Sequence, residues 1–297
     1  LMKSILHDRF EIAKSLMEKT ADVCGLDKDG KTILHHLCLK SDDHVDLVKR
    51  ALTASNGRAI LNSLDNDGAT PLYYAATHGR TNTVNYLLSL KDCDVNACAK
   101  DGTSPLMKSI LHDRFEIAKS LMEKTADVCG LDKDGKTILH HLCLKSDDHV
   151  DLVKRALTAS NGRAILNSLD NDGATPLYYA ATHGRTNTAR CFLAFKECDI
   201  NQCARDGTSP FMQSISRDQF EIAEMLLEKK VDVCTMDHEG TTILHHVCSK
   251  DRDNVGFLKS LVEAPHGMYM VNARDSDGAT PILYAATHGL TKTVQFL

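Results

Sequence analysis

The chain has 297 residues, of which 42% are hydrophobic and 25% are charged, and this balance excludes an intrinsically disordered protein. Its formal net charge of -5 argues against a general nucleic-acid binder, which usually has a strongly basic domain. No apolar stretch approaches the roughly 18 to 20 residues that a membrane helix needs, so we expect no membrane insertion.

The eleven cysteines are spread along the chain, their number is odd, and no two of them form a Cys-x-x-Cys pair. A disulfide framework is typical of short secreted chains, so this distribution indicates reduced thiols. We therefore expect a cytoplasmic location, with the nucleus as the alternative.

The chain repeats itself with two periods. Residues 1–83 recur without change as residues 106–188, and a third, diverged copy begins at Phe211, which gives a period of 105 residues. A shorter period of 38, 34 and 33 residues is marked by an acidic residue followed by glycine, at 29–30, 67–68, 101–102, 134–135, 172–173, 206–207, 239–240 and 277–278. Such periods are typical of stacked repeat proteins.

Each short period predicts a turn followed by two helices. After the turn at 67–68, Thr70 is placed to cap a helix and Pro71 to begin it, because proline is tolerated at the first helical position. Gly79 ends this helix, and the apolar positions within 84–88 predict a second, amphipathic one. Two short helices cannot bury their apolar faces alone, so successive pairs are expected to stack into a solenoid.

Two kinds of departure from this pattern leave local predictions open. The 38-residue periods have isoleucine (Ile33, Ile138 and Ile243) in place of the proline, and they carry about five extra residues around 41–43 and 55–58. We expect these extra residues to form longer loops. Asp113 and Asp218 replace the glycine between the two helices of their periods, so the turn at that point is less certain.

The run from Asp67 to Gly79, DGATPLYYAATHG, closed by Asp94-Val95-Asn96-Ala97, resembles an ankyrin repeat nearly position for position. The motif covers the whole chain. The resemblance implies an all-α solenoid of helix-turn-helix units with β-hairpin-like loops. It divides residues 1–297 into a single array of about nine units: a partial one at 1–28, then 29–66, 67–100, 101–133, 134–171, 172–205, 206–238 and 239–276, and a partial one at 277–297. Because both ends fall inside a unit, we expect a piece of a longer protein.

Three patterns that could carry chemistry have structural alternatives that we favour. His35-His36-x-Cys38, repeated at 140–143 and 245–248, has zinc-ligand residue types, but copies three units apart are too distant to share an ion. The resemblance places His35 at a structural histidine. Asp65-x-Asp67-Gly68 lacks the full ligand set of a calcium loop and predicts a turn, and Cys93 and Cys98 predict plain thiols. We expect no metal and no cofactor.

No catalytic motif is present: the chain has no phosphate-binding loop, no Gly-x-Ser-x-Gly elbow and no His-Glu-x-x-His helix. A solenoid also lacks the enclosed pocket that most catalysis needs. We therefore predict a protein that is not an enzyme, with no catalytic residues and no small-molecule substrate.

One face of the first helices has an unusual composition. In each unit the position after the motif histidine and the two before the mid-unit glycine stand at i, i+3 and i+4, and in ankyrin arrays they line the concave groove. We call these 27 positions the stripe, with a first, second and third position in each helix; they include six Lys or Arg, eight His, three Tyr and no acidic residue. The candidate partner-binding residues are Lys3, His36, Lys40, Tyr74, His78, Lys108, His112, His141, Lys145, Tyr179, His183, Arg217, His246, Lys250, Tyr284 and His288.

The stripe predicts non-catalytic binding of a protein partner that is extended or acidic, and the 105-residue period would also suit a repetitive partner. The tyrosines are the expected anchors, and the histidines would strengthen binding as the pH falls toward about 6. Two alternatives remain: a regulatory or tethering segment of a larger enzyme, ubiquitin ligase or ion channel, and a structural spacer. The resemblance also implies asparagine hydroxylation at Asn96 and Asn201, although side-chain hydrogen bonding in the turns is the favoured role of both.

Overall fold

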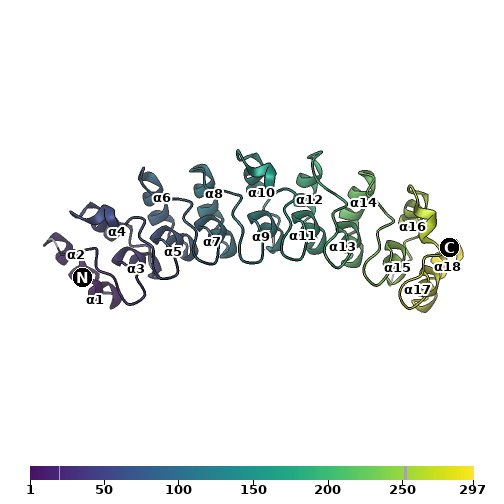
Figure 1. The fold of residues 1–297 in the computed structure, drawn as a ribbon, viewed down its shortest axis with the longest axis horizontal. Coiled ribbons are helices and arrows are strands. Elements are labelled where there is room, and N and C mark those ends of the chain that lie inside the picture. Colours follow the sequence, from purple (N-terminus) through teal and green to yellow (C-terminus); the bar gives the residue numbers. More distant parts are fainter. Residues whose placement is uncertain (20, 251–252) are drawn as a thin grey trace. The chain divides into compact units, whose positions relative to one another are not determined.

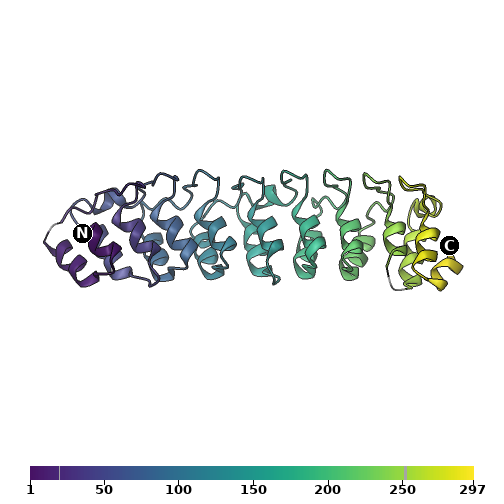
Figure 2. The same ribbon diagram turned by 90° about the horizontal axis from the view of Figure 1, so that it is seen from below.

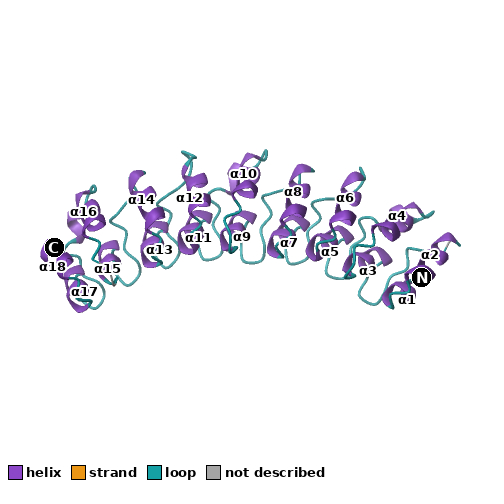
Figure 3. Ribbon diagram, turned by 180° about the vertical axis from the view of Figure 1, so that it is seen from behind, coloured by secondary structure: helices purple, strands orange, loops and turns teal. Residues whose placement is uncertain are grey.

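The computed structural model describes residues 1–19, 21–250 and 253–297, which form two compact units. The first unit holds residues 1–141 and 155–165, and the second holds residues 142–154 and 166–297. Over the described residues the regular structure is helical, with one isolated β-bridge between Met236 and Thr242 (Figure 3). The all-α prediction is confirmed, and the hairpin-like loops consist of turns.

The helices come in pairs, which we divide into first and second helices. The first helices are α1 (Met2–Leu6), α3 (Ile33–Leu39), α5 (Pro71–His78), α7 (Pro105–Leu111), α9 (Ile138–Leu144), α11 (Pro176–His183), α13 (Pro210–Ser216), α15 (Ile243–Cys248) and α17 (Pro281–Thr287). The second helices are α2 (Phe10–Glu18), α4 (Val45–Thr53), α6 (Thr81–Ser89), α8 (Phe115–Glu123), α10 (Val150–Thr158), α12 (Thr186–Leu193), α14 (Phe220–Glu228), α16 (Val255–Glu263) and α18 (Thr291–Phe296). Along the described ranges, none of these helices combines the length and the apolar character needed to cross a membrane.

Within each unit, helices of one kind pack on one another in a row. In the first unit α1, α3, α5 and α7 contact one another in turn, and so do α2, α4, α6 and α8. In the second unit α11, α13, α15 and α17 do the same, and α12 packs on α14 (Figure 1). The turns of each unit lie along one edge of its helices (Figure 2). The core lies between the two rows, where Leu72, Ala76 and Leu87 are buried.

Two different devices start the first helices. At α5 the Thr70 hydroxyl accepts the Tyr73 N–H at 3.2 Å and Pro71 is the first helical residue, as predicted. Where isoleucine replaces proline, Nδ1 of His35 contacts the backbone N and the hydroxyl of Thr32 at 3.0 and 2.9 Å. Nε2 of His35 then donates to the Ala69 carbonyl at 3.1 Å. The structural role predicted for His35 is confirmed, since this side chain joins two consecutive turns.

The turn that the sequence left uncertain is formed by aspartate in the left-handed conformation. Asp8, Asp113 and Asp218 have φ angles of 58°, 60° and 60°, close to the 75° of Gly79 at the corresponding point of α5. Aspartate tolerates this region better than most residues because its short polar side chain can bond locally. The connection between the paired helices is therefore kept without glycine.

The extra residues of the 38-residue periods do more than form longer loops. The Asp43 carboxylate accepts the Asn82 N–H at 2.7 Å and the Thr83 hydroxyl at 2.6 Å, at the start of α6, which has no side-chain cap of its own. The second group of extra residues forms a 3-10 helix, η1 (Gly57–Ile60), repeated as η2 (Gly162–Ile165) and η3 (Gly267–Met270). The expectation of longer loops is confirmed at 41–43 and is wrong for the second insertion, whose residues run into the 3-10 helix.

We expect Asp43→Ala to lower the free energy of unfolding by about 1 kcal/mol, because the amino end of α6 loses its acceptor. Asp42→Ala is the matched control, since Asp42 is exposed beside it. Urea unfolding followed by circular dichroism measures both. Equal unfolding midpoints for the two variants would show that the loop does not cap α6.

Candidate functional site

The stripe lies on the first helices, but its members differ in burial. Among its Lys, Arg, His and Tyr members, those exposed are Lys3, His7, His112, His183, Arg217 and His288. Half-buried members are Lys40, Tyr74, His78, Lys108, Lys145, Tyr179, His246, Lys250 and Tyr284, whereas His36 and His141 are buried. Most exposed members hold the third position, so that position supplies most of the surface that a partner would meet.

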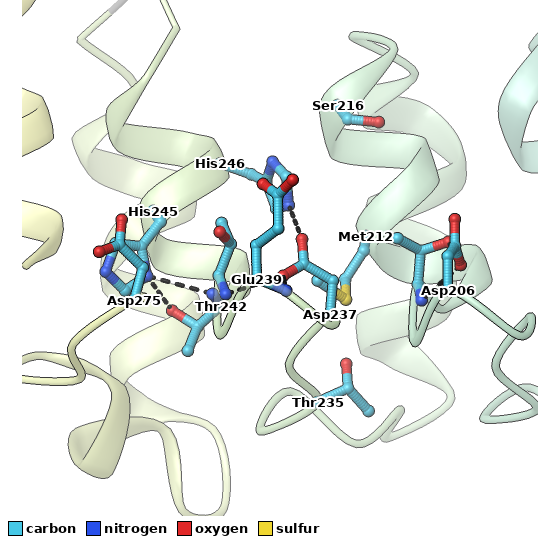
Figure 4. A network of polar contacts seen from close by, with 12 residues as sticks. Asp206, Met212, Ser216, Thr235, Asp237, Glu239, Thr242, His245, His246 and Asp275 are labelled. Carbon is cyan, nitrogen blue, oxygen red and sulfur yellow. Dashed lines mark hydrogen bonds and ion pairs between the residues drawn. The ribbon is translucent and has the colours of Figure 1, made fainter. Parts of the chain in front are cut away.

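Histidines at the first position contact a carboxylate of their own turn, nine residues earlier. Nε2 of the histidine and the carboxylate oxygen are 2.7 Å apart in His36–Asp27, 2.8 Å in His141–Asp132 and 3.6 Å in His246–Asp237 (Figure 4). Burial lowers the pKa of His246, although Asp237 opposes this. Burial raises the pKa of Asp27, but hydrogen bonds from the Lys31 N–H and from His36 outweigh it, so the pKa is lowered.

Tyrosines at the first position use the same spacing. The hydroxyl group donates at 2.7 Å to the carboxylate nine residues earlier in three pairs: Tyr74–Asp65, Tyr179–Asp170 and Tyr284–Asp275. Burial and the Asp65 carboxylate raise the pKa of Tyr74 to about 12. These hydroxyl groups are therefore held by the chain itself, and a partner would meet the edges and faces of the rings.

Asp65 is the centre of a buried network. Its side chain is fully buried, and that of Lys31 is 14% exposed. Lys31 Nζ lies 3.0 Å from the Asp65 carboxylate and 5.4 Å from the centroid of the Tyr74 ring. The other carboxylate oxygen accepts the N–H groups of Asp67 and Ala69 at 2.9 Å. These bonds confirm that Asp65-x-Asp67-Gly68 is a turn.

The sequence indicated a stripe without carboxylates, but the turns bring aspartates against it. Aspartate stands nine residues before every first-position histidine or tyrosine, whereas Ala99 and Ala204 stand there when the first position holds Lys108 or Gln213. Lys108 instead pairs with Asp101, seven residues earlier, at 3.3 Å. The aspartate nine residues before each of these histidines and tyrosines is visible in the sequence. It was missed because the stripe was selected along the helices alone, without the turn that precedes each helix.

Lysines at the third position join successive first helices. Lys40 Nζ lies 3.0 Å from the Leu6 carbonyl oxygen and 2.8 Å from the Asp8 carboxylate. Lys250 repeats this with the Ser216 carbonyl at 2.6 Å and Asp218 at 3.1 Å. Cations at a helix carboxyl end also stabilise the helix dipole. These lysines are thus partly neutralised, which leaves Arg217 as an exposed cation of the second unit.

The other sequence patterns have structural roles here. Cys38 is fully buried, and burial raises the pKa of its thiol. Burial and Asp94 raise the pKa of Cys93 to about 11, which keeps that thiol protonated. Among the residues that the structure describes, no three His, Cys, Asp or Glu side chains gather as metal ligands would.

The two asparagines singled out in the sequence join consecutive turns. Oδ1 of Asn96 accepts the Asp127 N–H at 2.8 Å, and Oδ1 of Asn201 accepts the Asp232 N–H at 2.9 Å. The favoured role in turn hydrogen bonding is confirmed. Hydroxylation at these side chains stays a prediction.

Two surface pockets bear on the choice of site. One of about 460 Å³ is lined by residues of α8, of α10 and of the turns that follow these two helices, outside the stripe. Another, of about 400 Å³, opens on the stripe of the second unit beside Tyr178 and Tyr179. Only the second adjoins the predicted binding face.

The family model for ankyrin repeats (3 copies) matches residues 1–97, 90–164, 141–237 and 230–297. Among curated proteins, the transient receptor potential cation channel subfamily A member 1 of Homo sapiens is 25% identical over 241 residues, which is 80% of this chain and 21% of the channel subunit. Inversin of Canis lupus familiaris is 28% identical over 202 residues, 67% of this chain and 18% of inversin. The NAD-dependent deacetylase sir2B of Dictyostelium discoideum is 26% identical over 250 residues, 78% of this chain and 30% of the deacetylase. The chain thus spans about a fifth of the length of the first two relatives.

Proposed function

Since this chain belongs to the ankyrin repeat family, whose repeats mediate protein–protein interaction and are generally non-catalytic, we propose that it is a scaffold that binds an extended or acidic segment of a protein partner along the stripe. Membership of the family supports the general class of activity, which is protein binding. The face and the chemistry of the partner are the parts proposed here.

The single observation that carries this proposal is the composition of the third position. All nine third positions hold His, Lys or Arg: His7, Lys40, His78, His112, Lys145, His183, Arg217, Lys250 and His288. Within each unit the first helices pack in a row, so these side chains follow one another along its surface. Positive potential of this kind attracts acidic segments and speeds their association.

The aspartates beside the stripe cancel only part of this potential. Asp8, Asp101 and Asp218, which pair with Lys40, Lys108 and Lys250, are exposed and reduce it locally. The Asp65 side chain is fully buried, and that of Asp27 is 18% exposed, so a partner meets little of either carboxylate. Histidines contribute unequally to it. Burial and the neighbouring Arg185 and Arg217 lower the pKa of His183, which gains charge only in more acidic solution.

The test compares two charge reversals of equal size in the second unit. Arg217→Glu changes the stripe, and Lys259→Glu changes an exposed lysine on α16, away from it. Acid-rich peptides are first selected on the parent protein from a random 12-residue display library. Their dissociation constants are then measured by fluorescence anisotropy.

We expect the dissociation constant to rise by about tenfold in Arg217→Glu and to stay within about twofold of the parent in Lys259→Glu. A selection without enrichment of Asp and Glu would contradict the acidic partner. An equal loss of binding in both variants would contradict the stripe as the site.

A second candidate is a regulatory or tethering segment of a larger protein. The observation that favours it is the small share of the channel subunit and the deacetylase, 21% and 30%, that this chain matches. In such a protein the array would position its host, and its stripe would bind a segment of the same polypeptide or of a membrane-bound assembly. Capture of a segment of the host chain by the isolated array would support this candidate.

A further inference from the structure

The pocket of about 400 Å³ on the second unit has an aromatic wall and an acidic wall. Tyr178 and Tyr179 form the first, with ring centroids 6.1 Å apart and an interplanar angle of 70°. Asp172 and Asp206 belong to the second, and Asp206 lies in the turn before α13 (Figure 4). A ring face next to carboxylates is suited to an organic cation.

The same arrangement 105 residues earlier in the chain shows what it binds. There Tyr73 and Asp101 correspond to Tyr178 and Asp206. Lys108 Nζ lies 5.5 Å from the centroid of the Tyr73 ring and 3.3 Å from the Asp101 carboxylate. Tyr73 is only 8% exposed. The ring and the carboxylate therefore hold an ammonium group that belongs to the chain itself.

The pocket at Tyr178 keeps the ring and the carboxylate but lacks the lysine. The tyrosine hydroxyl contacts a threonine hydroxyl at 3.1 Å in both places, Tyr73–Thr103 and Tyr178–Thr208. Gln213 replaces Lys108, and its Nε2 donates to the Thr208 hydroxyl at 3.3 Å, so no ammonium covers the ring from this position. Tyr178 is accordingly more exposed than Tyr73.

We propose that this pocket binds the side-chain ammonium of a lysine from a protein partner, in the place that Lys108 takes beside Tyr73 and Asp101. Asp172 and Asp206 outnumber Arg205 among the lining residues, and Arg217 acts on Tyr178 from beside the pocket, so the two carboxylates are the groups placed for a positive guest inside it. A lysine flanked by acidic residues would place its ammonium here and its neighbours beside Arg217. The identity of the donor rests on the proposed function, since a protein partner has to present the lysine.

The pocket can be tested without any partner, using n-butylammonium as the probe. The seven tyrosines are replaced biosynthetically by 3-fluorotyrosine, and the signals of residues 73 and 178 are assigned from Tyr73→Phe and Tyr178→Phe. Fluorine NMR then follows a titration. We expect a saturable shift of the Tyr178 signal, no shift of the Tyr73 signal, and no response to n-pentanol, which has similar length and no charge.

Two reciprocal variants control the assignment. Gln213→Lys gives the Tyr178 pocket the lysine that Lys108 supplies at Tyr73, and it should weaken butylammonium binding at Tyr178 by about tenfold or more. Lys108→Gln should create the same response at Tyr73. Lysine and glutamine already occupy the corresponding positions 108 and 213 of two folded repeats, so a failure to fold is not expected.

The proposal is overturned if the Tyr178 signal does not saturate, if n-pentanol shifts it equally, or if Gln213→Lys leaves it unchanged. These outcomes are distinct from a failure of the proposed function. A pocket that binds butylammonium while the stripe binds no acid-rich peptide would sustain the lysine site and contradict the acidic partner.

Discussion

Replacing Gly267 by alanine is expected to lower the free energy of unfolding by about 3 kcal/mol, at the upper end of the usual cost of overpacking. A Cβ atom at this position would lie 2.0 Å from the Leu261 carbonyl oxygen, a backbone atom that cannot rotate away. The same collision would occur at Gly57 and Gly162, with distances of 2.1 and 1.7 Å to the carbonyl oxygens of Ala51 and Ala156. The three 3-10 helices therefore depend on close backbone approach.

Gly256→Ala is the matched control for this prediction. Gly256 lies near the start of α16, the helix that precedes η3. It is exposed, and an added Cβ would have nothing within 4 Å. Alanine should stabilise this helix by about 0.5 kcal/mol, because glycine loses more backbone freedom on folding. The urea unfolding midpoint should fall in Gly267→Ala and rise in Gly256→Ala. Hydrogen exchange of the α16 amides should become faster in the first variant and slower in the second. Unchanged exchange in Gly267→Ala would show that the segment relaxes without cost.

Asp65→Ala is expected to cost about 3 kcal/mol, because removing one partner of a buried ion pair leaves the other charge uncompensated. The variant would strand the Lys31 ammonium, the Tyr74 hydroxyl and two backbone N–H groups that now share one carboxylate. Lys31→Thr is the control, since Thr241 occupies the corresponding position in the third copy. It should cost about 1 kcal/mol, because Asp65 keeps its other three donors.

The same network predicts a dependence on pH. Burial raises the pKa of Asp65, but the hydrogen bonds from Tyr74 and Lys31 outweigh it, and the pKa is lowered. A carboxylate with a lowered folded-state pKa stabilises the fold fully above its ordinary value, near about 4, and loses that contribution as the pH falls. The stability difference between the parent and Asp65→Asn should therefore be constant above about pH 5 and shrink below it. Urea midpoints between about pH 3 and 7 measure this, and a difference that grew on acidification would contradict it.

The sequence predicted the parts of this fold that depend on neighbours along the chain. The N-cap Thr70, the first-turn Pro71 and the helix end at Gly79 all act within one unit, and each lies where the pattern placed it. The sequence did not predict that Asp43 caps α6, because this contact joins one repeat to the next, over about 40 residues.

The stripe shows the same division between local and distant effects. Its residues could be selected from helical spacing alone, but their charge could not be assessed without the turn that folds against them. His36 and Asp27 are nine residues apart, as are Tyr74 and Asp65. Neither the helical nor the strand period predicts contact at that spacing. The role of Lys108 likewise depends on Asp101 and on the ring of Tyr73 in the preceding unit.

The bonds between neighbouring repeats limit how such a chain can lengthen. Lys40 reaches back to Asp8, Asp43 reaches forward to Thr83, and Tyr73 contacts Thr103, so each of the three kinds of junction has its own set of partners. Insertion or loss of a single repeat would create a junction whose two sides do not match. Addition of a block of three recreates every junction already present. The array can therefore gain three repeats at a time without requiring a new kind of interface between repeats.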